Sequence, residues 1–118
     1  MLCFYNMSNR RSDDLVFKAL ADRRRREILD LLRDAPRTTG QLCDHFRKLD
    51  RCTVMQHMRV LEKAGLIIVK REGRLRWNYL NVLPIRELHD RWISKYAVAA
   101  VDLLARLKRD LEGGGEAV

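Results

Sequence analysis

The sequence predicts a mainly α-helical domain with one small β-hairpin: four helices, then two strands, then a long last helix. Three observations predict this order. Apolar residues recur at steps of three and four over most of the 118 residues, which is the period of helices that face a core. Between residues 66 and 80 this pattern gives way to a β-branched run and an alternating run, with Glu72-Gly73 between them as a turn. Helix-capping residues stand directly before several of the expected helices.

The first two helices are predicted from their caps and their apolar positions. Ser12 or Asp13 can cap the first helix and Asp22 the second, because each supplies an oxygen to the free N–H groups of a first turn. Both repeat apolar residues on one side: Leu15, Val16, Ala19 and Leu20, then Ile28, Leu31 and Leu32. Four arginines at 23–26 cover several faces of one turn, so they form either a solvated helix end or phosphate contacts. Pro36 ends the second helix, because it pushes the preceding residue out of the α region.

The next two helices are short and follow each other closely. Thr38 and Gln41 have the spacing of a capping box and begin the third helix, while Asp50 caps the fourth and Gly65 ends it in a left-handed conformation. Their apolar sides hold Leu42, Cys43 and Phe46, then Val54, Met58 and Leu61. Helix, turn, helix and basic hairpin in this order are typical of a winged helix-turn-helix, a unit that reads DNA.

The hairpin, or wing, follows this unit. Leu66–Val69 is a short β-branched run, and in the second strand apolar residues alternate with Arg76 and Asn78: Leu75, Trp77 and Tyr79. We expect Trp77 and Tyr79 to form the core of the wing. The alternative is that their rings stack on single-stranded bases.

The last helix should begin at Pro84 and run to about Leu111. Its apolar stripe is Ile85, Leu88, Trp92, Tyr96, Ala99, Leu103, Leu107 and Leu111. A helix of roughly 27 residues is about 40 Å long, which exceeds what so small a domain can cover. The surplus apolar face predicts a second copy of the chain as partner. The alternative is a helix folded back or broken near Ser94.

Composition restricts the classes of function. Lysine and arginine exceed aspartate and glutamate by 24 − 16 = 8, so the natural partner is a polyanion such as a nucleic acid or an acidic membrane surface. No apolar run approaches the ~18 residues of a membrane span, and no signal pattern opens the chain. We therefore expect a cytoplasmic protein without a membrane partner. No paired-carboxylate, Ser/His/Asp or phosphate-loop pattern predicts an enzyme.

The length predicts a single folded domain, which we place at residues 12–112. Flexible ends are expected at residues 1–11 and 113–118. Met7 is an alternative start, because residues 1–6 show no periodicity that joins them to the helix that follows. The glycines at 113–115 are typical of a frayed tail.

Three segments resemble the ArsR-type (arsenic-repressor-like) winged helix-turn-helix regulators of bacteria. They are Ala19–Arg23 leading into Arg26–Leu32, the block Thr53–Leu66, and the wing segment Arg71–Leu80. The likeness covers about residues 13–110, with a small departure at Arg23, where many members have proline. The resemblance implies a homodimeric repressor, built on its first and last helices, that binds an inverted repeat in operator DNA. The expected interface residues are Leu15, Leu88, Trp92, Tyr96, Ala99 and Leu103.

The metal sites of that family are not matched. Its metal-sensing cysteines correspond to Thr38 and Gly40, which are not ligands, and His89 stands on the last helix without a second histidine after it. We therefore expect no metal and no cofactor, and the sequence names no inducer. The alternative function is a metal- or thiol-responsive sensor that uses Cys43, His45 and Cys52. Cys52 lies beside Arg51 in a first helical turn, where the helix dipole and a cation would favour the thiolate. We nevertheless expect an inert small residue there, with a redox switch as the alternative.

DNA contacts are expected from the outer side of the fourth helix and from the wing. Gln56 can pair with adenine, Arg59 with guanine or a phosphate, and Thr53 can meet a thymine methyl. His57 is expected to be packed or to contact a phosphate. The wing cations would bind the phosphate backbone or the minor groove. The complete expected set is Arg51, Thr53, Gln56, His57, Arg59, Lys63, Lys70, Arg71, Arg74 and Arg76. A winged-helix module that binds protein instead of DNA is the remaining alternative.

Overall fold

The computed structural model describes the backbone of residues 2–117 and the side chains of residues 10–113. The chain divides into two compact units, one up to Ile85 and one from Arg86 onward. That residues 1–11 and 113–118 are flexible ends stays a prediction. The predicted fold class is confirmed: most of the chain is helical, with one small antiparallel sheet.

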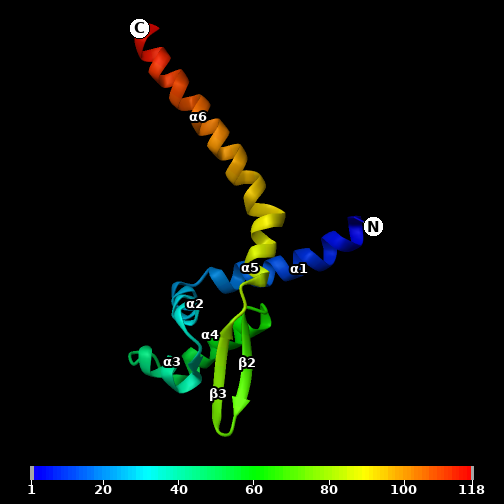
Figure 1. Cartoon of the computed structure of the whole chain (residues 1–118), viewed down its shortest axis with the longest axis vertical. Helices are drawn as coiled ribbons and strands as arrows, with labels where there is room; N and C mark the ends of the chain where they lie inside the picture. Colours follow the sequence, from blue (N-terminus) through cyan, green and yellow to red (C-terminus); the bar gives the residue numbers. More distant parts are fainter. Residues whose placement is uncertain (1, 118) are drawn as a thin grey trace. The chain divides into compact units, whose positions relative to one another are not determined.

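Four helices of the first unit follow the predicted order (Figure 1): α1 (Leu2–Leu20), α2 (Arg23–Asp34), α3 (Thr39–His45) and α4 (Arg51–Lys63). Three predicted caps are confirmed. Asp22 accepts hydrogen bonds from the N–H groups of Arg24 and Arg25, Thr38 and Gln41 form the capping box, and Asp50 accepts from the N–H of Thr53 at 2.7 Å.

The predicted start of the first helix is wrong. Because α1 begins at Leu2, Ser12 and Asp13 lie in its interior and not at its N-terminus. Serine and aspartate cost only a few tenths of a kcal/mol more than average residues inside a helix, so neither forces a start. A capping residue therefore marks a helix end only where the preceding residues leave the helix.

The core of the first unit joins all four helices. Its largest buried side chains include Val16, Ile28, Leu42, Val54, Met58 and Leu61, which confirms the inward positions predicted for α4. In α2 the buried set is Ile28, Leu29 and Leu32, whereas the predicted Leu31 is only half-buried. Helix α2 packs against α1, α4 and the sheet, so its buried face is set by neighbours on more than one side.

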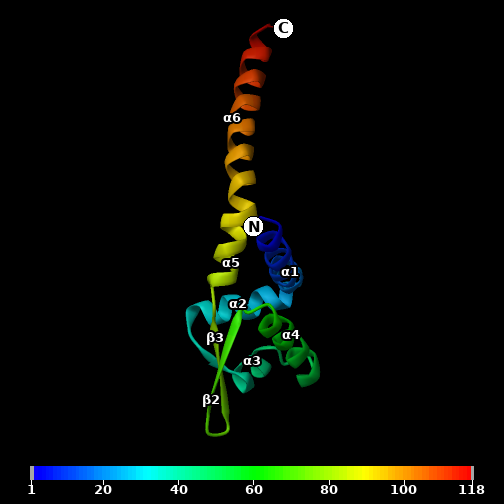
Figure 2. The same cartoon turned by 90° about the vertical axis from the view of Figure 1, so that its right-hand side faces the viewer.

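The sheet has three strands in the order β1-β3-β2: β1 (Arg37–Thr38), β2 (Ile67–Glu72) and β3 (Leu75–Leu80). The strand β1 was not predicted, because two residues are too few for a period. Gly65 ends α4 at φ +76° as predicted, and Gly73 forms the hairpin turn at φ +60°. Both views show the β2–β3 hairpin projecting from the helices of the first unit (Figures 1 and 2).

The buried side of β3 differs from the prediction. Asn78 is completely buried, while Leu75 is about half exposed and Trp77 and Tyr79 are partly buried. The Asn78 amide donates to the backbone oxygen of Arg37 at 3.1 Å and to the Thr39 hydroxyl at 3.2 Å. These bonds satisfy the amide nitrogen, whereas the amide oxygen is buried without a hydrogen-bond partner among the described residues. A polar side chain can thus lie on the buried side of a strand, so alternation of apolar residues alone did not identify the inner face.

The last helical segment contains a π turn. Helix α5 (Leu83–Leu88) is followed by the π-helical turn η1 (His89–Ile93), and α6 (Ser94–Ala117) continues beyond the predicted end at Leu111. The N–H of Ser94 donates to the backbone oxygen of His89, so the segment neither folds back nor stops at Ser94. None of the helices within residues 2–117 has the length and hydropathy needed to cross a membrane.

Candidate nucleic-acid interface

Helix α4 divides its residues between two sides. Val54, Met58 and Leu61 are buried, while the exposed positions are Arg51, Cys52, Gln56, Arg59 and Lys63, and Thr53 is half-buried. The Asp50 cap fixes the first turn of this helix. Hydrogen bonds from the hydroxyl and the N–H of Thr53 hold the pKa of the Asp50 carboxyl below its usual value, so the cap stays ionised. The polar side of α4 thus begins at a capped first turn.

His57 belongs to the buried side of α4, not to the exposed one. It is 8 % exposed, and its Nδ1 lies 3.4 Å from Nη1 of Arg25 in α2. The expectation that it contacts a DNA phosphate is corrected by this position. Residues 54, 57, 58 and 61 follow the i, i+3, i+4, i+7 pattern of one helix face, so the packed alternative was already present in the sequence.

The wing carries three exposed cations, Lys70, Arg71 and Arg74. Lys70 lies 3.6 Å from Glu72 on the surface. The fourth predicted cation, Arg76, is half-buried and forms an ion pair with Glu62 of α4. This pair ties strand β3 to α4, so Arg76 has a positioning contact that the sequence did not predict.

A hollow of about 340 Å³ lies between the wing and the two helices of the helix-turn-helix. It brings Arg51 of α4 together with Arg74 and Arg76 of the wing. The other lining residues are Thr38, Thr39, Gly40, Met55 and Leu75. The sequence reasoning missed the three residues at the start of α3 as part of a site. The capping box at Thr38 marked that position as a helix start, but not its closeness to the wing.

The four arginines at 23–26 have two different environments. Arg25 donates to the backbone oxygens of Lys18 and Ala19, and Arg26 to that of Leu20, so both bind the end of α1. Arg23 and Arg24 are exposed and line a cleft. Arg26 is still exposed, as predicted for a solvated helix end, whereas the half-buried Arg25 fits neither predicted alternative.

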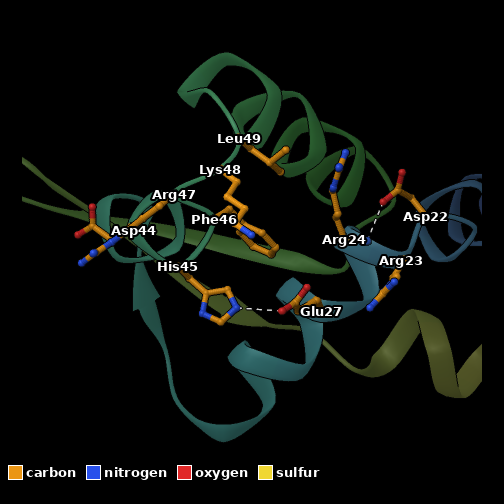
Figure 3. Close-up of a pocket in the computed structure, with 10 residues that line it drawn as sticks. All are labelled: Asp22, Arg23, Arg24, Glu27, Asp44, His45, Phe46, Arg47, Lys48 and Leu49. Atoms are coloured by element: carbon orange, nitrogen blue, oxygen red, sulfur yellow. Dashed lines mark hydrogen bonds and ion pairs between the residues drawn. The ribbon is translucent and has the colours of Figure 1, made fainter.

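The cleft has a volume of about 830 Å³ and lies between the start of α2 and the turn after α3 (Figure 3). Its lining is Asp22, Arg23, Arg24, Glu27, Asp44, His45, Phe46, Arg47, Lys48 and Leu49. His45 Nε2 lies 3.0 Å from a Glu27 carboxylate oxygen and so joins α3 to α2. Cations and carboxylates both line the cleft, and this mixed charge favours no class of ligand.

The residues proposed for a metal or thiol sensor lie as follows. Cys43 is half-buried and Cys52 is exposed, and both are free thiols. His45 pairs with Glu27. Within the part of the chain that the structure describes, no three His, Cys, Asp or Glu side chains converge as metal ligands. The side chain of Cys3 lies outside the described residues.

The predicted interface residues of the last helix are mostly exposed. Trp92 is 46 %, Tyr96 54 % and Leu103 67 % exposed, and Ala99 is exposed as well. The rings of Trp92 and Tyr96 lie against each other with centroids 4.9 Å apart. Leu88, by contrast, is buried within a single chain and offers no surface to a partner, which corrects that prediction. In α1, Leu15 is half-buried.

Comparison with known proteins finds relatives among transcriptional regulators. Residues 20–70 match the helix-turn-helix domain family. The chain is 33 % identical over 72 residues to the transcriptional repressor SdpR of Bacillus subtilis, covering 61 % of this chain and 79 % of the relative. It is 35 % identical over 87 residues to the uncharacterised HTH-type transcriptional regulator YuzN of the same organism, covering 69 % and 95 %. Among solved structures, an ArsR family transcriptional regulator matches with a TM-score of 0.68 and 27 % identity, covering 75 % of this chain and 90 % of that chain.

Proposed function

We propose, for a chain that belongs to the ArsR-type winged helix-turn-helix family of transcriptional regulators, that it is a homodimeric repressor of transcription. It binds an inverted repeat in double-stranded operator DNA and acts in the cytoplasm. The folded domain is taken as residues 12–112. The mechanism is one of binding and contains no catalytic step.

The single observation that carries this proposal is the two-sided helix α4. Its buried side fixes the helix on the domain, while Gln56 and Arg59 stand exposed one turn apart on the other side. Glutamine can form two hydrogen bonds with adenine and arginine two with guanine in the major groove, so these two side chains read the sequence. Arg51, Thr53 and Lys63 extend the same surface toward both ends of the helix.

The wing and the hollow beside it would bind the DNA backbone. Lys70, Arg71 and Arg74 are exposed cations on the hairpin, and Arg74 also lines the 340 Å³ hollow together with Arg51. The Thr38 and Thr39 positions add hydrogen-bonding groups to that hollow. A phosphate group of one strand fits this combination of charge and polar groups. Such contacts position a protein on DNA without selecting a sequence.

Dimerisation is supported by the exposed apolar side of α6. Tyr96 and Leu103 lie on this helix and Trp92 lies in the turn η1 directly before it, with about half or more of each side chain exposed. Contiguous apolar surface of this kind marks an interaction site, and a second copy presents the same surface in return. Leu15 of α1 is proposed to join the interface. A symmetric dimer carries two copies of α4 and therefore requires two half-sites in inverted orientation.

The test is recovery of bound DNA followed by affinity measurements. Genomic fragments retained by the protein should share an inverted repeat, and a duplex carrying it should bind with strong salt dependence. Arg59→Ala should weaken this binding, whereas Arg33→Ala is the control, because Arg33 is an exposed arginine near the end of α2. Equal affinity for the recovered duplex and for random duplexes would refute sequence-specific recognition.

A further inference from the structure

One guanidinium joins the three helices α1, α2 and α4. Arg25 of α2 donates from Nε to the backbone oxygen of Ala19 at 2.9 Å and from Nη2 to that of Lys18 at 2.8 Å. Both oxygens belong to the last turn of α1, where backbone carbonyls lack partners within the helix. The remaining nitrogen, Nη1, lies 3.4 Å from Nδ1 of His57 in α4. The same side chain therefore caps α1 and reaches the recognition helix.

The geometry also fixes the protonation of His57. Arginine can only donate hydrogen bonds, so Nδ1 must be the acceptor and the imidazole proton must sit on Nε2. Nε2 is buried and has no hydrogen-bond partner among the described residues. The charged groups that face this imidazole are Asp22, Arg25 and Arg24, all at the start of α2.

These surroundings disfavour a charged imidazole. Burial is the main cause that lowers the pKa of His57, Asp22 opposes it, and Arg25 and Arg24 lower the pKa further. A second proton would enter at Nδ1, since Nε2 already carries one. It would remove the acceptor used by Arg25 and leave two cations facing each other in a mostly buried place.

We propose that Arg25 is a positioning residue for DNA recognition: its guanidinium, bonded to the end of α1 and to neutral His57, holds α4 against the end of α1. This connection through Arg25 and His57 is called the joint below. A proton taken up at Nδ1 of His57 breaks the joint and weakens operator binding. The inference rests on the proposed function for its DNA readout, but the joint itself exists without DNA. The consequence is a regulator that responds to acidification through a residue on the hidden side of its recognition helix.

The first experiment uses the wild-type protein without DNA. The ring proton signals of His57 are followed by NMR from pH 8 to pH 5, and amide hydrogen exchange of α4 is compared at pH 7.5 and pH 5.5 after correction for the intrinsic rate. Protonation of His57 should coincide with faster exchange in α4, by about tenfold in the opening equilibrium. Unchanged protection of α4 across the titration of His57 would overturn the proposal.

The second experiment measures affinity for a duplex selected from a random pool by the wild-type protein at pH 7.5. At fixed salt, the wild type should lose about tenfold in affinity between pH 7.5 and pH 5.5. His57→Asn keeps an acceptor near the Nδ1 position and does not titrate. The affinity of this variant should therefore differ by less than about twofold between pH 7.5 and pH 5.5. His45→Asn is the control, because His45 is exposed and paired with Glu27, and this variant should stay as acid-sensitive as the wild type.

The outcomes separate the two proposals. If the wild type binds no duplex at pH 7.5, the proposed function fails, and hydrogen exchange still decides whether the joint exists. If His57→Asn loses as much affinity on acidification as the wild type, the joint does not control binding. Arg25→Lys supplies a variant that leaves His57 intact. Lysine keeps the charge but cannot reach all three acceptors, so this variant should bind the selected duplex several-fold more weakly than the wild type at pH 7.5.

Discussion

Helices α4 and α6 carry the same kind of apolar pattern but have opposite surroundings. Both repeat apolar residues at steps of three and four, as in Val54, Met58 and Leu61 of α4. In α4 these side chains are buried by the rest of the chain, whereas Tyr96 and Leu103 of α6 are more than half exposed. An apolar stripe therefore indicates that a helix packs against another surface, but it does not indicate whether that surface belongs to the same chain.

The largest expected effect is on the α4 side of the comparison. Leu61→Ala removes a completely buried side chain and should lower the free energy of unfolding by about 2–5 kcal/mol. Because the surrounding core belongs to the same chain, denaturant unfolding should give this loss at every protein concentration. A loss that vanished on dilution would show that the α4 core also depends on a second copy.

The matching change in α6 should act on assembly. Ala99→Glu combined with Leu103→Glu places two charges on the exposed apolar side, so sedimentation at micromolar concentration should find monomers. Affinity for an inverted repeat should fall on the order of 10²-fold, because two half-sites would no longer be bound by one linked particle.

Lys108→Glu is the matched control for that double variant. It changes the net charge by the same two units but lies on the opposite side of the helix from Ala99, nine residues along. It should remain dimeric. A wild type that sediments as a monomer at micromolar concentration would remove the contrast between the two helices.

A smaller effect is expected within the outer side of α4 and the wing. Gln56→Ala or Arg59→Ala should each cost about 1–3 kcal/mol at the cognate site and relax its sequence preference. Arg74→Ala should weaken all duplexes evenly and reduce the salt slope by about one. If Arg59→Ala and Arg74→Ala had equal effects on cognate and random duplexes, the division between reading and positioning would be wrong.

Acid should loosen α4 before it affects α6. The pKa of His57 is lowered in the fold, so the unfolded chain binds the proton more readily and stability falls as pH drops below about 6.5 toward the folded pKa. Thermal unfolding should show this loss for the wild type and not for His57→Asn. The carboxylates of Asp22 and Asp50, whose pKa values are also lowered, should add their loss only at more acidic pH.

The smallest effect is expected from metal. The resemblance to the family sets Thr38 and Gly40 at its cysteine positions, so we expect DNA affinity with a chelator to equal affinity with added zinc at fixed salt. A tenfold difference, about 1.4 kcal/mol of coupling, would mean that Cys43, His45 or Cys52 joins a site that forms on binding.

The sequence by itself determined the features whose causes lie within a few residues. The caps at Asp22, Thr38 and Asp50 and the left-handed Gly65 depend on a side chain and on N–H groups no more than four positions away, and all four were predicted. The outer side of α4 followed from its period alone. The order of helices and hairpin was predicted for the same reason.

The tertiary structure decided whatever depends on contacts between distant residues. The strand β1 exists because Arg37 pairs with Asn78, 41 positions along the chain. Arg25 and Arg26 bind the end of α1, Arg76 pairs with Glu62, and His57 is buried beneath α2. A charged or polar residue has several good partners in principle, and only the packing of the elements selects one. For the same reason the stripes of α4 and α6 looked alike in the sequence, and only the fold distinguished the one that the chain itself buries.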